Sequence, residues 1–210
     1  MDLHTISRLV GTRAVMEAVL PMMHGDLLDL GAGLSKNKDL YLRQAKSYTA
    51  FDIDPQPNID IVGDVLDPRI PDESFDTIVS NQVIEHVRKP WVMAEQIARM
   101  LRPGGTCILT APFLVPYHAH PHDYFRFTEA GLRSLLEDAG LTVEICSKYG
   151  SIWIVHWEML KMRFFSPYTT HSWCVRRMKQ VVEKTFWFLG KHATPNIAYA
   201  SVVCIATKPR

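Results

Sequence analysis

Apolar residues along the chain follow two kinds of spacing, which predicts alternating strands and helices. Short apolar runs bounded by turn residues are typical of buried strands, and apolar residues repeating at every third and fourth position are typical of amphipathic helices. The first segment, 6–20, has the helical spacing and ends before Pro21. Strands are predicted at 26–30, 47–52, 59–62, 75–81, 106–111, 141–146 and 199–207, and further helices at 36–45, 90–101 and 128–139.

This alternation between residues 26 and 146 predicts a doubly wound, largely parallel α/β sheet. Only the segment 55–58 separates the second predicted strand region from the third. A parallel crossover normally needs a dozen or more residues, so we interpret this segment as an extended link that replaces a helix. Ligands of such sheets bind beyond the carboxyl ends of the strands.

A glycine-rich turn, Asp29-Leu30-Gly31-Ala32-Gly33, follows the first predicted strand and precedes a helix. Glycines there let the backbone approach a ligand and adopt positive φ without steric cost. Carboxylates end the next two strands: Asp52 can accept bonds from both hydroxyls of a ribose, and Asp64 can accept a proton of an adenine amino group. The nicotinamide-dinucleotide fingerprint needs glycine where this chain has Lys36, which disfavours that cofactor.

Six segments, taken in order, resemble the class I S-adenosylmethionine (SAM)-dependent methyltransferases, specifically the type-11 group. The segments are Leu28–Gly33, Phe51–Asp54, Gly63–Val65, Pro71–Asp76, Val83–Val87 and Leu101–Gly105, within residues 27–145. The resemblance implies a seven-stranded Rossmann-like sheet whose last strand is antiparallel, in a single domain over 1–210 with a helical insertion at about 151–192. It also implies that SAM is the cofactor.

The same resemblance assigns parts of SAM to parts of this chain. It implies that Gly31 and Gly33 face the methionine part, that Asp52 faces the ribose, and that Asp64-Val65 faces the adenine. The expected cofactor-binding set is Asp29, Gly31, Ala32, Gly33, Asp52, Ile53, Asp64, Val65 and Asn81. Ser35 departs from the family, which often has a third glycine there, and serine fits if φ is negative at that position.

The end of the fourth predicted strand bears on the methyl acceptor. Ser80-Asn81-Gln82 lacks the Asn/Asp-Pro-Pro-aromatic motif usual in amino-group methyltransferases of this fold and the Pro-Cys motif of cytosine-C5 enzymes. O-methylation of a small molecule is therefore favoured, and a hydroxyl acceptor needs a base. Glu85-His86 follows within one turn. In related enzymes His86 lies near the substrate, although it could instead only hold the loop by a bond to the backbone.

Residues 112–127 form a loop rich in histidine and proline after the fifth predicted strand. We expect this loop to cover the cofactor site, and imidazole titrates near neutral pH. His118 or His122 is therefore the predicted base, with Asp123 orienting it. In the alternative interpretation His122, Asp123 and Arg126 are a hydrogen-bonded scaffold.

Metal binding by the same loop is considered and not expected. His118, His120 and His122 stand at alternate positions beside Asp123, and imidazole with carboxylate suits zinc or a non-haem metal. A proline-rich loop, however, gives these side chains no fixed geometry.

Two functions remain open. The first is SAM-dependent O-methylation of a small-molecule or carrier-linked acceptor, because the loop resembles that of a type-11 subgroup often associated with saccharide or secondary-metabolite pathways. The second is a SAM-binding scaffold protein of the same fold without turnover. A base in the loop 112–127 distinguishes the two.

Composition and charge exclude some partners. The 210 residues carry a net charge of +1, which gives no field for binding nucleic acid. The chain has neither a signal-peptide pattern at its start nor an apolar stretch near the ~20 residues that span a bilayer. The four cysteines are widely spaced, with Cys107 and Cys204 in apolar strands, so we expect reduced cysteines and a cytoplasmic protein.

The insertion at 151–192 mixes basic with aromatic residues. Such helices can bind an anionic membrane or a lipid-linked acceptor, form a lid or a homodimer contact, or pack on the sheet with their basic face solvated. These three roles stay open. The residues concerned are Trp153, Trp157, Lys161, Arg163, Phe164, Phe165, Tyr168, Trp173, Arg176, Arg177, Lys179, Lys184, Phe186, Trp187, Phe188 and Lys191.

Overall fold

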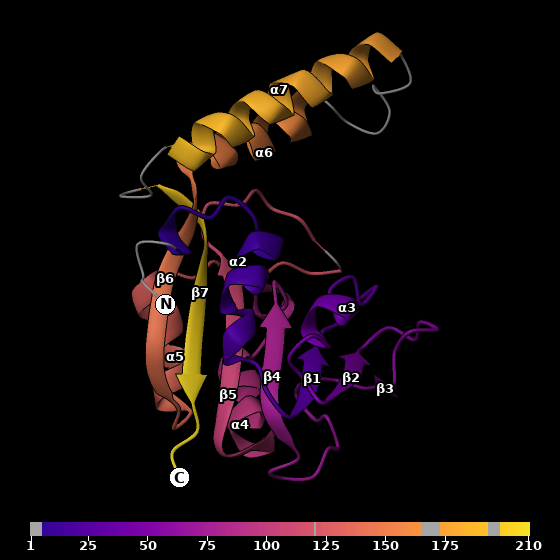
Figure 1. The fold of residues 1–210 in the computed structure, drawn as a ribbon, viewed down its shortest axis with the longest axis vertical. Coiled ribbons are helices and arrows are strands. Elements are labelled where there is room, and N and C mark those ends of the chain that lie inside the picture. Colours follow the sequence, from indigo (N-terminus) through magenta and orange to yellow (C-terminus); the bar gives the residue numbers. More distant parts are fainter. Residues whose placement is uncertain (1–5, 120, 165–172, 193–197) are drawn as a thin grey trace.

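The computed structural model describes residues 6–119, 121–164, 173–192 and 198–210. Its centre is a seven-stranded sheet in the order β3-β2-β1-β4-β5-β7-β6 (Figure 1). β7 is antiparallel to both of its neighbours, whereas the first five strands run parallel. The predicted Rossmann-like sheet with an antiparallel last strand is confirmed. The strands are β1 (Asp26–Leu30), β2 (Ser47–Asp52), β3 (Ile61–Val62), β4 (Phe75–Asn81), β5 (Leu101–Pro112), β6 (Thr142–Ser151) and β7 (Tyr199–Thr207).

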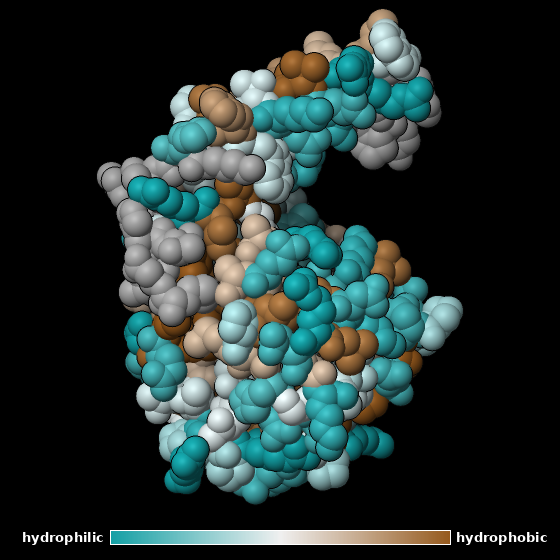
Figure 2. Space-filling view, in the orientation of Figure 1, coloured by the Kyte–Doolittle hydropathy of each residue, from teal (hydrophilic) through white to brown (hydrophobic). Residues whose placement is uncertain are grey.

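Two helices, α6 (Ile152–Phe164) and α7 (Trp173–His192), occupy the predicted insertion and extend beyond the carboxyl ends of the parallel strands (Figure 1). We call this pair the helical hairpin. Figure 2 shows an open notch between the hairpin and the body of the protein. The Trp187 ring packs on Gly11, where an added Cβ would lie only 2.8 Å from it. No helix of the described chain is long and apolar enough to cross a membrane.

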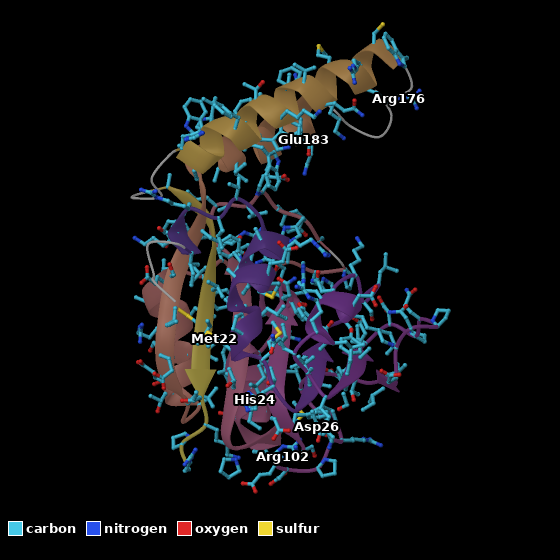
Figure 3. All side chains as sticks on the ribbon, in the orientation of Figure 1. Met22, His24, Asp26, Arg102, Arg176 and Glu183 are labelled. Atoms are coloured by element: carbon cyan, nitrogen blue, oxygen red, sulfur yellow. A yellow bond between two sulfur atoms is a disulfide. The ribbon has the colours of Figure 1, made fainter. Side chains whose placement is uncertain are left out.

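At the other end of the strands from the hairpin, Arg102 joins the carboxylates of Asp26 and Asp76; Figure 3 labels Arg102 and Asp26. Its Nη1 donates to Oδ2 of Asp26 at 3.0 Å and to Oδ2 of Asp76 at 2.7 Å. Hydrogen bonds from Ser47 and Arg102 lower the pKa of Asp26. The pKa of Asp76 is also lowered, because bonds from the Asp26 backbone and from Arg102 outweigh the effect of its burial. This ion-pair network fixes the amino ends of β1 and β4.

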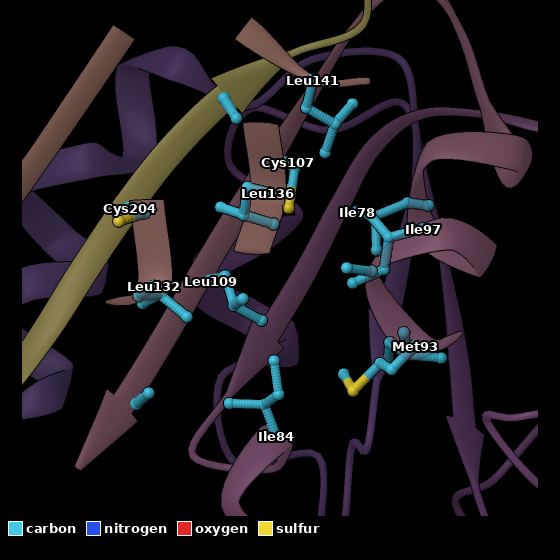
Figure 4. Packing of buried hydrophobic residues seen from close by; sticks show 14 of the residues in the cluster. Ile78, Ile84, Met93, Ile97, Cys107, Leu109, Leu132, Leu136, Leu141 and Cys204 are labelled. Atoms are coloured by element: carbon cyan, nitrogen blue, oxygen red, sulfur yellow. The ribbon is translucent and has the colours of Figure 1, made fainter. Parts of the chain in front are cut away.

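Helices cover both faces of the sheet, as the alternation of elements predicts. On one face Ile97 and Leu136, from two different helices, pack with Ile78 and Leu109 of the sheet (Figure 4). On the other face a separate cluster joins the first helices to β1. Burying each such side chain contributes about 1.5–3 kcal/mol. The helices of the first face are α4 (Pro90–Met100) and α5 (Glu129–Asp138), and those of the second are α2 (Thr12–Val19) and α3 (Lys38–Tyr41).

Several predicted boundaries differ from the structure. The helix predicted over 6–20 is interrupted: residues 6–7 are helical, and α2 begins only at Thr12, because the backbone of Gly11 is extended at φ −156°. β5 begins at Leu101 instead of residue 106, because Leu101 pairs with Phe75 across a register shift. β6 is longer than predicted because its pairing with β7 continues to Ser151.

The extended link at 55–58 is confirmed. β2 and β3 pair in parallel, with Phe51 opposite Ile61, and no helix lies between these two described strands. Asp60 supports the same junction, because its Oδ2 accepts the backbone N–H of Ala50 at 2.7 Å.

The expectation of reduced cysteines is wrong for one pair. Cys146 and Cys204 stand opposite each other on β6 and β7 and form a disulfide. This pairing depends on the antiparallel register of two segments 58 residues apart, which cysteine spacing alone does not reveal. Cys107 is a buried thiol, and burial raises its pKa to about 12.

Candidate active site

The glycine turn after β1 adopts the conformation that its sequence predicts. Gly31 and Gly33 have φ values of +84° and +52°, which glycine adopts without steric cost. The N–H groups of Gly31 and Ala32 both donate to the carbonyl of Phe51, at 2.8 and 3.0 Å. A Cβ on Gly31 would lie 2.4 Å from Val83, whereas a Cβ on Gly33 would meet nothing within 4 Å. The backbone at Gly33 therefore remains open to a ligand.

Ser35 corrects one expectation. Its φ is +49°, so the negative φ that would make serine an easy replacement for glycine is absent. Asn58 of the extended link compensates in part, because its Nδ2 donates to Oγ of Ser35 and to the carbonyl of Gly33, both at 2.8 Å. Sequence reasoning missed Asn58, since it lies in a segment without helical or strand pattern.

The predicted acids stand at the ends of the first three strands. Oδ2 of Asp52 accepts the N–H of Gly33 at 2.8 Å, so this carboxylate is held against the glycine turn. Oδ1 of Asp64 accepts the N–H of Leu66 at 2.9 Å. Ile53 beside Asp52 is 63% exposed, which leaves an apolar surface free next to the acid.

Asp29 is the buried acid of the site. It is 5% exposed, and the Tyr48 hydroxyl donates to its Oδ2 at 2.8 Å. Burial raises the pKa of Asp29 to about 6. Tyr48 is a further residue that sequence reasoning missed, and β2 carries it. Asp29 lines a cavity of about 220 Å³ together with Gly31, Ala32, Leu34, Lys36, Asn37, Tyr41 and Asn81.

This cavity fits a ligand with both cationic and hydroxyl groups. A buried carboxylate gains most from an ammonium group, and a carboxylate at a strand end suits ribose hydroxyls. Asn81 is fixed at the cavity wall because its Oδ1 accepts the hydroxyl of Thr110 at 2.7 Å. Asp29 and Asn81, predicted from sequence, are thus brought to one cavity with Gly31 and Ala32. Asp52 does not line this cavity but is bonded to Gly33 of the same glycine turn.

The loop after β5 is tied to η2 (Ile84–His86), a short helix that follows β4. The N–H of Tyr124 donates to the Glu85 carbonyl at 2.8 Å, and Nδ1 of His86 donates to the His122 carbonyl at 2.6 Å. Arg126 holds Asp123 with both terminal nitrogens. These bonds hold the loop against η2, which follows the end of β4.

The candidate bases differ in their surroundings. His118 is 40% exposed in its side chain, and its Nε2 lies 3.6 Å from Oε1 of Glu85. His122 is exposed and its ring lies 5.3 Å from that of Tyr124. Asp123 accepts the backbone N–H of His118 at 2.9 Å, and the pKa of Asp123 is well below its usual range because Arg126 binds it. His120 lies outside the described residues.

Glu85 is the least expected residue of the site. Its side chain is fully buried, and neither carboxylate oxygen has a hydrogen-bond partner among the described residues. Burial raises its pKa to about 7. Oε1 lies 3.7 Å from Nε2 of His86 as well as 3.6 Å from Nε2 of His118. The adjacent pair Glu85-His86 was noticed in the sequence, but the burial of Glu85 depends on the loop that covers it.

Part of the chain is similar in sequence to known methyltransferases. A family model described as a methyltransferase domain matches residues 28–109. A probable SAM-dependent methyltransferase of Mycolicibacterium smegmatis is 30% identical over 135 residues, covering 57% of this chain and 52% of that relative. The chain therefore spans about half the length of that curated relative.

Solved structures share the fold at low identity. The [4+2]-cyclase SpnF has a TM-score of 0.62 and 18% identity, over 97% of this chain and 84% of that chain. Phosphoethanolamine N-methyltransferase 2 of Haemonchus contortus, in complex with SAM, has a TM-score of 0.61 and 16% identity, over 95% of this chain and 52% of that chain. The motifs, the fold and the family match agree: residues 28–109 match a methyltransferase domain of the type-11 group, and the chain is similar to SAM-dependent methyltransferases, which points to SAM as the cofactor.

Proposed function

We propose that this protein is a SAM-dependent methyltransferase that methylates a hydroxyl group of a small or carrier-linked acceptor, such as a saccharide or secondary metabolite. SAM supplies a methyl group activated on a sulfonium. The observation that carries the proposal is the placement of His118 against the buried carboxylate of Glu85 at the carboxyl edge of the sheet. We treat 1–210 as one domain that contains both this edge and the hairpin.

Residues of the turn and strand ends would hold the cofactor. Asp29 is buried in the cavity and would accept the methionine ammonium, which compensates its burial. Asp52, already fixed by Gly33, would accept the ribose hydroxyls. Asp64 would accept the adenine amino group. The remaining cofactor residues would be Gly31, Ala32, Gly33, Ile53, Val65 and Asn81.

The acceptor side of the site would rest on the histidine-rich loop. A hydroxyl must lose its proton as it is methylated, and imidazole is suited to this at neutral pH. His118 has the carboxylate neighbour that such a role needs, and His122 is the other candidate. The contacts of His86 and Asp123 favour positioning roles, because one binds the His122 carbonyl and the other binds Arg126 and the His118 N–H.

The helical hairpin would bring the protein to an anionic lipid surface, where a lipid-linked acceptor would reside. Met178, Val181 and Phe188 of α7 are 53%, 57% and 63% exposed, and exposed Arg177 and Lys184 belong to the same helix. Arg177, Val181, Lys184 and Phe188 stand three or four positions apart and so share one face of α7. On such a face the apolar side chains can enter a lipid surface while the long basic side chains reach its anionic headgroups. The wild type should sediment with anionic vesicles. The variant Phe188→Ser should stay in the supernatant, whereas the control Thr185→Ala should sediment like the wild type. Dimerisation without vesicle binding would contradict this part.

Two measurements test the proposed function. S-adenosylhomocysteine should raise the melting temperature, because a ligand selective for the native state stabilises it. Labelled methyl groups should then be transferred to members of a panel of free sugars, nucleotide sugars and phenols, with much less turnover in His118→Ala at unchanged cofactor affinity. Cofactor binding without any transfer would favour the scaffold protein, and no shift at millimolar ligand would contradict cofactor binding itself.

A further inference from the structure

Three ligand atoms from two separate segments converge at the carboxyl edge of the sheet. Oε1 of Glu85 lies 3.7 Å from Nε2 of His86 and 3.6 Å from Nε2 of His118. The atoms that these three residues offer all lie within 4.8 Å of one another. The imidazole rings of His86 and His118 meet edge to face, with centroids 5.1 Å apart. This group, which we call the Glu-His-His cluster, joins η2 to the loop after β5.

The backbone determines which ring nitrogen of each histidine carries a proton. Nδ1 of His86 lies 2.6 Å from the His122 carbonyl, and Nδ1 of His118 lies 3.0 Å from the Pro116 carbonyl. A carbonyl only accepts hydrogen bonds, so each Nδ1 is the protonated donor. In the neutral rings each Nε2 therefore carries a lone pair.

The cluster then contains only acceptors. Two lone pairs and a fully buried carboxylate without a partner face one another. The nearby guanidinium of Arg126 does not fill this role, because it is bonded to Asp123 and to the carbonyls of the loop. A single proton can satisfy only one pair of these atoms, whereas a cation at the centre satisfies all three.

We propose that the Glu-His-His cluster binds a divalent transition-metal ion, with Zn²⁺ as the expected occupant. Metal–ligand bonds of about 2.1 Å at tetrahedral angles separate ligand atoms by about 3.4 Å, close to the two distances from Glu85. Imidazole ligands favour Zn²⁺ and its transition-metal neighbours over Mg²⁺ or Ca²⁺. The carbonyls that bind both Nδ1 atoms supply the outer contacts that metal-bound histidines usually have.

Three protein ligands leave a fourth position open, as in catalytic zinc sites. The assignment of that position rests on the proposed function: an acceptor hydroxyl would bind there and lose its proton to solvent near neutral pH. His118 then acts on the acceptor proton through the ion instead of accepting it. The Glu-His-His cluster also differs from a metal site formed by the loop histidines alone, because two of its ligands come from η2.

The test is a titration of the full chain, stripped with a chelator, with ZnCl₂ in a calorimeter and with Co²⁺ by visible absorption. The wild type should bind one ion. His118→Ala and His86→Ala should each weaken binding by about tenfold or more. His122→Ala is the matched control from the same loop. It keeps the carbonyl that holds His86, so its affinity should stay within about twofold of the wild type.

Glu85→Gln tests the carboxylate with little change of shape, and thermal melting shows whether each variant folds. Absence of binding to the wild type, or equal losses in His118→Ala and His122→Ala, would overturn the metal site. S-adenosylhomocysteine shifts on the same samples keep the two proposals apart. If the protein binds zinc but S-adenosylhomocysteine does not raise its melting temperature, the metal site stands and the proposed function is wrong. If the melting temperature rises but zinc does not bind, only the metal site is wrong.

Discussion

The side-chain amide of Asn58 donates to the carbonyl of Gly33 at 2.8 Å, across 25 residues of sequence. The same nitrogen binds Oγ of Ser35, whose φ is positive. The extended link that replaces the usual crossover helix thus holds the cofactor turn in place. Such a contact compensates part of the strain of a left-handed serine, which costs about 1–2 kcal/mol.

Replacing Asn58 with Ala should weaken S-adenosylhomocysteine binding by about threefold to tenfold, because one or two hydrogen bonds of about 0.5–1.5 kcal/mol order the turn. Calorimetric titration measures this directly. Gln56→Ala is the control, since Gln56 is exposed in the same link and should leave affinity unchanged. Equal affinity of Asn58→Ala and wild type would show that the turn needs no support from the link.

Local pattern was sufficient for most of the fold. The strands β1, β2, β4 and β7 match their predicted bounds because each is an apolar run with turn residues on both sides. The N-terminal cap of α5 is also predictable from sequence: Oγ1 of Thr128 accepts the N–H of Gly131 at 3.0 Å. The pairing of distant strands cannot be predicted from local pattern, and this pairing determines where β6 ends and which cysteines form the disulfide.

The residues of the candidate site likewise fall into those that local sequence predicts and those that depend on long-range contacts. Asp29, Gly31 and Asp52 could be predicted because strand ends place them at one edge of the sheet. Glu85 could not, since its burial and its contact with His118 arise from a loop that begins some 30 residues later and folds back over η2. The loop sequence suggested Asp123 as a partner for His118, and the structure places these two residues in contact. It also brings His118 to Glu85 and His86, which follow β4 and which the loop sequence does not reveal.

Asp29→Asn should stabilise the ligand-free protein at neutral pH. The folded pKa of about 6 lies above the ordinary aspartate value of 3.8, so the folded state binds more protons than the unfolded state between these values. Stability therefore falls as pH rises from about 4 to about 6, by at most about 3 kcal/mol. Urea unfolding at pH 4 and pH 7 should show the gain of the variant only at the higher pH. Asp39→Asn, at an exposed position, should show no such gain.

The two glycines of the cofactor turn should respond differently to alanine. Gly33→Ala incurs the cost of positive φ, about 1–2 kcal/mol, in open space. Gly31→Ala adds a clash at 2.4 Å with Val83 and should lower stability by clearly more. Thermal melting of both variants without ligand tests this order. If Gly31→Ala were the milder change, the turn would not be packed against Val83 as described.

Arg102→Met should destabilise the protein at pH 7 and have little effect in acid. Arg102 is hydrogen-bonded to Asp26 and Asp76, whose pKa values are both lowered in the fold. A lowered carboxyl pKa contributes stability that is present above the unfolded value of 3.8 and is lost as pH falls through the folded value. The difference between the urea midpoints of wild type and variant should therefore be largest at pH 7 and shrink as the pH falls below 3.8. Arg13→Met is a suitable control, because Arg13 pairs with Glu17 on the exposed side of α2 and such pairs contribute little. A difference between wild type and Arg102→Met that persists unchanged at pH 3 would mean that Arg102 acts through packing instead of charge.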